Sequence, residues 1–117
     1  MKKIAIPVIE GKLSQYFGQC SHYLIYEIEG DEIVKTELEI PVSYDLSEIP
    51  EWAAKQGITD IITYKIDQQI ISKFINNKIN LFIGVPFDTP QNLIDDYLNG
   101  RLISDEKIIK EITELVK

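Results

Sequence analysis

Residues 16–29 read YFGQCSHYLIYEIE, a loop that passes directly into a strand. In the strand half, apolar and aromatic residues alternate between two faces, with Leu24, Tyr26 and Ile28 on one and Tyr23, Ile25, Glu27 and Glu29 on the other. A period of two is the pattern of a strand in a sheet. The loop half holds the only cysteine and the only histidine of the 117-residue chain. The stretch therefore predicts a strand that fixes where Cys20 and His22 point.

Further strands are predicted on both sides of this stretch. Residues 32–40 (EIVKTELEI) alternate again after a turn at residues 30–31, which predicts a hairpin with one buried face. Residues 3–9 (KIAIPVI) and 79–85 (INLFIGV) are nearly continuous apolar runs, which are typical of strands buried on both faces. Residues 60–64 (DIITY) form a shorter strand. Because Pro7 cannot donate a ladder hydrogen bond, we expect the first strand to loosen or end near it.

Helices are predicted between and after the later strands. Ser47, Asp67, Thr89 and Ser104 are expected to open them, and Gly57 is expected to end the first in a left-handed conformation. The helix after Asp67 is expected to turn four residues inward, namely Ile70, Ile71, Phe74 and Ile75.

This order of elements, β β β α β α β α α, predicts one α/β domain over residues 1–117. Strand–helix–strand crossovers give parallel strands covered by helices. The expected result is a mixed five-stranded sheet with helices on both faces, an order that suits a three-layer, ribonuclease H-like fold. A nuclease of that architecture needs acidic residues on adjacent strands to hold two metals. Residues 3–9 contain none, so a nuclease is disfavoured.

The chain carries a formal net charge of −7, and the acidic residues are concentrated. Ten acidic residues and two lysines lie between Glu27 and Asp60. An acidic face repels phosphate backbones, so nucleic acid is not an expected partner. This face is either a solvated surface or a docking face for a basic partner. A single cysteine and the absence of any run of about 20 apolar residues lead us to expect a cytoplasmic protein that does not enter the membrane.

The chain offers few residues suited to catalysis or metal binding. Cys20 and His22 are the only available Cys–His nucleophile pair, but no oxyanion-hole glycines accompany them, and we expect no enzyme. A thiolate and an imidazole suit iron–sulfur clusters, zinc or copper, although two ligands do not complete a zinc tetrahedron. The pair could anchor a cluster that brings its own sulfide, or complete a site in a homodimer. Otherwise it is a half-buried cysteine beside a surface histidine.

Several motifs together resemble the dinitrogenase iron–molybdenum cofactor biosynthesis family. They are the opening KIAIPV, the loop Ser14-Gln15-Tyr16-Phe17-Gly18, then Cys20 and the strand YLIYEIE. The resemblance continues through residues 49–52 (IPEW), 57–62 (GITDII) and 92–102 (NLIDDYLNGRL), so that it covers residues 2–102. Members of this family are small carrier or accessory domains, and the resemblance implies the same ribonuclease H-like fold.

The resemblance also implies a non-enzymatic carrier of an iron–sulfur or iron–molybdenum-type cluster, exchanged with a donor or acceptor protein. Tyr16, Phe17 and Gly18 would line the cofactor site, and Cys20 and His22 would ligate metal. Family members carry a histidine where this chain has Tyr16, and a Gly-Gly-x-Gly motif where it has residues 64–67 (YKID). The alternative is therefore a degenerate member without metal, acting as an interaction module through the acidic hairpin.

Overall fold

The computed structural model describes residues 2–17, 20–40, 46–85 and 88–102. The strands are β1 (Lys2–Ile9), β2 (Lys12–Leu13), β3 (His22–Glu29), β4 (Glu32–Glu39), β5 (Asp60–Ile62) and β6 (Asn80–Phe82). The helices are the short 3-10 turn η1 (Leu46–Glu48), α1 (Ile49–Lys55), α2 (Gln68–Asn76) and α3 (Pro90–Leu98). The helix predicted from Ser104 lies outside the described residues. Within the described residues, no helix is long and apolar enough to cross a membrane.

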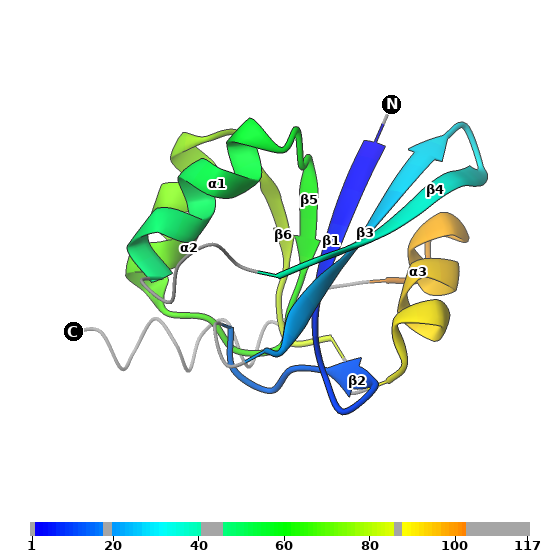
Figure 1. Ribbon diagram of the computed structural model, residues 1–117, viewed down its shortest axis with the longest axis horizontal. Helices are drawn as coiled ribbons and strands as arrows, with labels where there is room; N and C mark the ends of the chain where they lie inside the picture. The colour runs from blue at the N-terminus through cyan, green and yellow to red at the C-terminus, as the bar shows by residue number, and fades with distance from the viewer. Residues whose placement is uncertain (1, 18–19, 41–45, 86–87, 103–117) are drawn as a thin grey trace.

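The five main strands form one mixed sheet in the order β4-β3-β1-β5-β6 (Figure 1). β1, β3 and β4 pair antiparallel, whereas β5 and β6 continue the sheet parallel to β1. This confirms the predicted mixed five-stranded α/β fold, and the strand order is compatible with a ribonuclease H-like fold. The short strand β2 was not predicted. It forms because the chain turns back at Glu10 and Gly11, both with positive φ, and sets Leu13 opposite Val8.

Helices cover both faces of the sheet, with α1 and α2 on one side and α3 on the other (Figure 1). Neighbouring residues of one strand point to opposite faces, so Ile61 and Ile62 enter two different cores. The first core, under α1 and α2, includes Ala5, Ile25, Ile49, Ala53, Ile61, Ile70 and Phe74. The second core, under α3, includes Ile4, Ile6, Ile28, Ile62, Leu93 and Ile94. Burial of these side chains is the main force that holds each layer on the sheet.

Pro7 interrupts the sheet on one side only. β1 runs through it to Ile9, and Pro7 lies opposite Tyr23 in the antiparallel ladder with β3. The parallel ladder with β5 stops earlier, at Ala5. The strand therefore loosens toward β5, where a donor is missing, without ending near Pro7.

The helix caps mostly follow the sequence. The Asp67 side chain accepts the Gln69 backbone N–H at 2.9 Å, and Gly57 has the expected left-handed φ of 78°. Two predictions about the helices were wrong. η1 precedes α1, whose N-cap residue is Glu48 rather than Ser47 and makes no side-chain cap bond. Ile75 is 62% exposed, because it follows Phe74 by one residue and lies beyond the stripe that faces the sheet.

Candidate functional site

The loop that begins at Ser14 crosses the carboxyl end of β1. The Ser14 backbone N–H donates to the carbonyl of Pro7 at 2.9 Å, and the Ser21 backbone N–H donates to that of Val8 at 2.9 Å. Both ends of the loop are thus attached to the last residues of the same central strand. In open α/β sheets, ligands bind beyond the carboxyl ends of the strands. A binding site is therefore expected at this end of the sheet.

The same loop is joined to the segment that follows β5. The Phe17 backbone N–H donates to the Lys65 carbonyl at 2.8 Å, and the Lys65 N–H donates to the Gln15 carbonyl at 3.1 Å. These bonds make a short parallel bridge between Tyr16 and Lys65. The Lys65 Nζ lies 5.7 Å from the centre of the Tyr16 ring, within cation–π range. The aromatic loop and residues 64–67, distant in sequence, are therefore neighbours in the fold.

Two of the predicted cofactor-lining residues have different surroundings. Tyr16 is 43% exposed and available to a ligand. Phe17 is buried, and its ring packs edge-on against Phe74, with ring centres 5.4 Å apart, and at a tilt against Tyr23, with ring centres 6.0 Å apart. Phe17 therefore fixes the loop to the first core. Gly18, the third predicted residue, lies outside the described residues.

Cys20 is partly buried, and its side chain packs against the first core. Burial raises the pKa of its thiol, and the nearby Tyr23 hydroxyl partly opposes that rise in pKa. Tyr23 is 1% exposed, and burial, followed by the charge of a Cys20 thiolate, raises its pKa in turn. Within the described residues, the Tyr23 and Thr63 hydroxyls are buried without a well-formed hydrogen bond. The Tyr23 hydroxyl is thus close enough to the thiol to interact with it and has no other partner there.

His22 begins β3 opposite Val8, and its Nδ1 lies 2.8 Å from Ser21 Oγ. The Ser21 hydroxyl donates its single hydrogen to the Val8 carbonyl at 3.0 Å. With that hydrogen on the Val8 carbonyl, the Nδ1–H tautomer of a neutral imidazole could donate to Ser21 Oγ and would keep its lone pair on Nε2. Strand alternation turns His22 away from Tyr23, whereas Cys20 packs on the Tyr23 side. The two predicted ligands therefore leave the chain toward different faces of the sheet.

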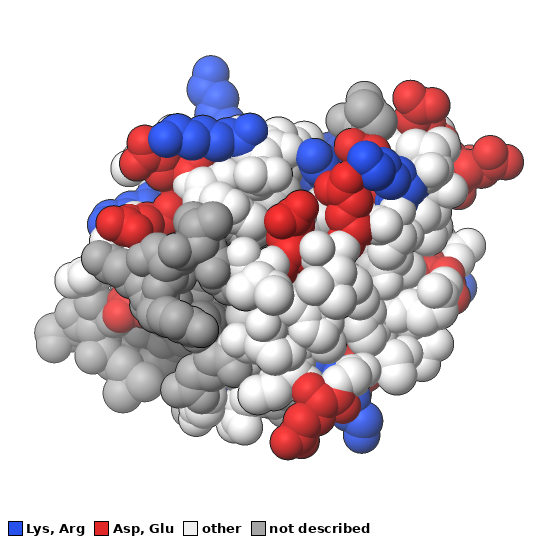
Figure 2. Space-filling view, in the orientation of Figure 1, with Lys and Arg blue, Asp and Glu red and all other residues white. Residues whose placement is uncertain are grey.

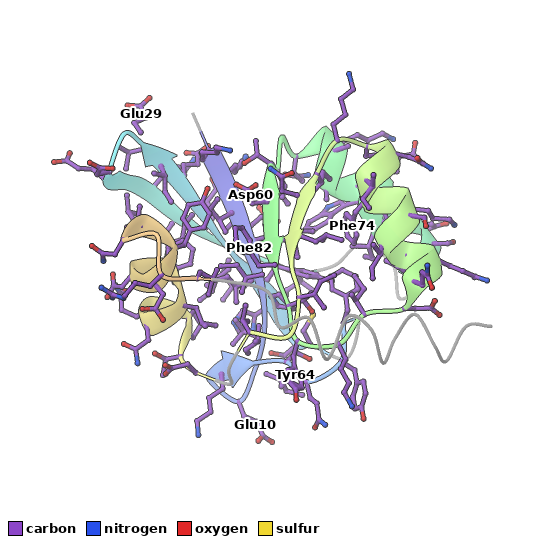
Figure 3. The ribbon with its side chains drawn as sticks, turned by 180° about the vertical axis from the view of Figure 1, so that it is seen from behind. Glu10, Glu29, Asp60, Tyr64, Phe74 and Phe82 are labelled. Atoms are coloured by element: carbon purple, nitrogen blue, oxygen red, sulfur yellow. The ribbon has the colours of Figure 1, made fainter. Side chains whose placement is uncertain are left out.

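No complete metal site is formed by the residues that the structure describes, because no three His, Cys, Asp or Glu side chains converge there. A shallow depression of about 380 Å³ does open beside the loop, lined by Ile9, Glu10, Lys12, Leu13 and Gln15. Figure 3 shows Glu10 and Tyr64 at this end of the sheet, away from Glu29 at the hairpin end.

Lys65 is a candidate site residue that the sequence did not reveal. A single lysine between Tyr64 and Ile66 carries no recognisable signal. Its place beside Tyr16 becomes visible only once the two segments are seen to pair. The one sequence hint was its position within residues 64–67, which occupy the place of the Gly-Gly-x-Gly motif.

A second polar cluster, centred on Asp60, lies away from the loop (Figure 3). Asp60 is 1% exposed and accepts hydrogen bonds from Asn80 Nδ2 at 3.0 Å and from the Tyr97 hydroxyl at 2.9 Å. Lys2 Nζ lies 3.8 Å from the same carboxylate. Because its partners are all supplied by the fold, this carboxylate serves to join β5, β6 and α3.

The mixed sheet, with a Tyr- and Cys-bearing loop across the carboxyl ends of its central strands, defines a small α/β domain with a binding-type site at one end. The family model described as dinitrogenase iron-molybdenum cofactor matches residues 1–100. The chain belongs to this family.

The chain is also similar to individual proteins. An uncharacterized protein of Methanocaldococcus jannaschii, MJ0580, is 42% identical over 38 residues, a segment that spans 32% of this chain and 32% of that protein. The crystal structure of PH0822 is similar with a TM-score of 0.79 and 24% identity, covering 88% of this chain and 94% of that one. The crystal structure of MJ0327, also from M. jannaschii, has a TM-score of 0.68 and 27% identity, covering 86% and 90%.

Proposed function

We propose that this protein is a non-enzymatic carrier that holds an iron–sulfur or iron–molybdenum-type cluster at the carboxyl ends of β1 and β5. The observation that carries the proposal is the pairing of Tyr16 with Lys65. Through it, one end of the sheet presents the exposed Tyr16 ring, on the loop that bears Cys20, beside the Lys65 cation from the segment that follows β5. Membership of the dinitrogenase iron-molybdenum cofactor family supports a cargo of this kind.

A cluster suits the donors better than a single ion does. On this side of the sheet the described residues offer Cys20, and they form no group of three ligands. A single zinc ion would need four ligands, whereas a cluster arrives with its own sulfides and needs fewer protein bonds. In this proposal Cys20 ligates the cargo and the Lys65 ammonium offsets the negative charge of the cluster. His22 leaves the chain toward the other face of the sheet and takes no part in this site.

The protonation of Cys20 makes binding depend on pH. Burial raises the pKa of the thiol, so at neutral pH it holds a proton that a metal must displace. The Tyr23 hydroxyl, which has no other well-formed partner among the described residues, is available to donate to the sulfur once the proton has left. Cluster binding is therefore expected to strengthen as the pH rises.

Anaerobic reconstitution tests the proposal. Purified protein is incubated with iron and sulfide, desalted, and its visible spectrum is recorded beside those of Cys20→Ser, Lys65→Ala and Lys55→Ala. Charge-transfer absorbance should survive desalting, disappear in Cys20→Ser, weaken in Lys65→Ala and persist in Lys55→Ala. Lys55 is the matched control because its exposed ammonium lies on α1 and pairs only with Glu51 at 3.5 Å within the described residues. Absorbance that is unchanged by Cys20→Ser would contradict the assigned site.

A second candidate function is that of a family member that binds no metal and acts through its acidic hairpin. It is favoured by Tyr16 in place of histidine and by residues 64–67 without glycine. The two candidates differ in what they require of Cys20, because only the carrier needs an accessible thiol. A wild-type protein that stays colourless on reconstitution, and whose native thiol resists labelling at all pH values at which the protein is folded, would favour the second candidate.

A further inference from the structure

β4 forms one edge of the sheet, because the strand order ends at it and no described strand pairs with its outer side. It is eight residues long, as long as β1 and β3. Three apolar side chains on or just after it are exposed: Val34 at 52%, Leu38 at 58% and Ile40 at 66%. A long edge strand with exposed apolar side chains is a template for pairing with another strand.

The charges of β4 restrict what can pair with it. Around Thr36 the sequence reads Val34-Lys35-Thr36-Glu37-Leu38, with opposite charges at equal distances on the two sides. An antiparallel copy of the same strand, related by a two-fold axis through Thr36, would therefore set Lys35 opposite Glu37 in both directions. It would also bring Leu38 to the position of Val34 at each end of the paired stretch.

We propose that a second copy of this chain pairs with β4 in an antiparallel manner, with Thr36 opposite Thr36, to make one continuous sheet. Such an isologous contact is self-complementary by symmetry. Cross-strand Thr–Thr pairs and opposite-charge pairs are both stabilising, so the centre of the contact contains only favourable pairs.

Neighbouring registers each place like charges opposite one another. An axis through Lys35 sets lysine against lysine, and an axis through Glu37 sets glutamate against glutamate. An axis through Leu38 sets Glu37 against Glu39. Like charges directly opposite in a sheet are destabilising, so these registers are disfavoured. Compared with these registers, the register through Thr36 is therefore favoured by the charges of the strand.

The paired stretch is short. The ladder with β3 shifts between Glu27 and Ile28, which leaves Val34 without a partner there and bends the strand. A contact of a few residues buries less area than a stable dimer usually does, so the dimer is expected to be weak and to depend on concentration. Figure 2 shows lysine and acidic side chains interspersed along this part of the surface, beside a broad uncharged area.

Charge exchange tests the contact in solution. Sedimentation velocity over a wide concentration range would be measured for the wild type, Lys35→Glu, Glu37→Lys and the double variant Lys35→Glu/Glu37→Lys. Each single variant should weaken self-association by about tenfold, because two attractive pairs become repulsive. The double variant should restore it. Thermal unfolding of each variant confirms that the fold is kept, and a wild type that stays monomeric at all concentrations would overturn the proposal.

Disulfide trapping tests the register independently, in a Cys20→Ser background. Thr36→Cys should cross-link rapidly under mild oxidation, because directly opposite residues have Cα atoms about 4.5–5.5 Å apart, within disulfide range. Ile40→Cys is the matched control, since the two copies of this residue would lie about 26 Å apart along the strands. Equal cross-linking of the two variants, or faster cross-linking of Ile40→Cys, would overturn the register. Neither test depends on a bound cluster, so they are separate from the proposed carrier function.

Discussion

At the residue scale, Cys20 is controlled by its surroundings. A thiol in apolar surroundings favours its neutral form, and Cys20 packs against the first core. The raised pKa means that the thiolate is a minor species at neutral pH. The thiol is thus held in its unreactive, protonated form, and the ligand role proposed for it requires that a metal or a higher pH remove this proton.

This predicts the pH dependence of thiol labelling. Native protein should react with a disulfide reagent more slowly at neutral pH than the same protein unfolded in denaturant, and the difference should shrink as the pH rises through the raised pKa. Tyr23→Phe should slow native labelling further, because it removes the hydroxyl that lowers the pKa of Cys20. Labelling at the same rate in both states at every pH would contradict this interpretation.

The raised pKa of Cys20 also affects stability. A group with a higher pKa in the folded state binds more protons there, so its contribution is complete below the ordinary thiol pKa and is lost as the pH rises through the raised one. The free energy of unfolding of the wild type should therefore fall in that alkaline range. Cys20→Ser should reduce the slope, as measured by urea unfolding in a series of buffers, and an unchanged slope would contradict the assignment to Cys20.

The hydroxyl of Tyr97 is a second residue whose effect can be measured. It donates to the buried carboxylate of Asp60 at 2.9 Å, and burial, followed by that carboxylate, raises the pKa of Tyr97. Tyr97→Phe should lower the free energy of unfolding by about 1–3 kcal/mol, because it removes a hydrogen bond to a charged group. Tyr16→Phe is the control, since Tyr16 is partly exposed, and should change stability by less than about 0.5 kcal/mol. Equal effects would contradict a role for the Asp60 cluster.

At the element scale, α2 shows how a helix is placed by few side chains. Asp67 caps its first turn, and Ile70 and Phe74, one turn apart, are its two buried residues. The Phe74 ring packs edge-on against Phe17, so α2 also holds the loop of the candidate site in place. This contact links the packing of a helix to the geometry of the loop.

The buried stripe on α2 predicts that substitutions at two adjacent residues, Phe74 and Ile75, change the free energy of unfolding by very different amounts. Phe74→Ala should lower the free energy of unfolding by about 3–5 kcal/mol, because it leaves a cavity in the first core. Ile75→Ala should lower it by less than about 1 kcal/mol, since that side chain is 62% exposed. Urea unfolding of the two variants measures both values, and similar losses would mean that Ile75 is buried in solution.

At the scale of the whole molecule, the sheet separates two cores and also couples them. Neighbouring residues of β1 and β5 enter opposite cores, so neither core can be lost without moving the strands that line the other. The Asp60 cluster adds a further link between β5, β6 and α3. We therefore expect the two faces to unfold together.

A substitution in one core should accordingly be reported by a probe in the other. Leu93→Ala, in the second core, should lower the free energy of unfolding by about 2–5 kcal/mol. Trp52, the only tryptophan in the chain, packs on the first core, and its fluorescence transition should shift by the same amount as the far-ultraviolet circular dichroism. Two separate transitions would show that the cores unfold independently.

Much of the fold could be predicted from local patterns. Alternation predicted the strands β3 and β4, apolar runs predicted the strands β1 and β6, and the capping residues Asp67 and Thr89 placed two helices. The burial predicted for two of these strands was wrong. The apolar face of β4, with Val34 and Leu38, is exposed, and β6 lies at the edge of the sheet with its side chains exposed or only partly buried. The failures lie at positions decided by more distant contacts. β2 is only two residues long and forms by turning back on β1, and Ile75 depends on how far the sheet extends under α2. Neither carries a signal in its own neighbourhood.

The sequence by itself determined the mixed α/β architecture and the resemblance that family membership bears out, because periodicity and motif spacing are local properties of the chain. Only the tertiary structure brought Tyr16 beside Lys65, because that bridge joins segments separated by almost fifty residues. Tertiary packing likewise decided that Phe17 is a core residue and that Cys20 lies next to an unpartnered tyrosine hydroxyl among the described residues. Burial and its effect on pKa depend on what surrounds a side chain, and residue order alone does not specify those surroundings.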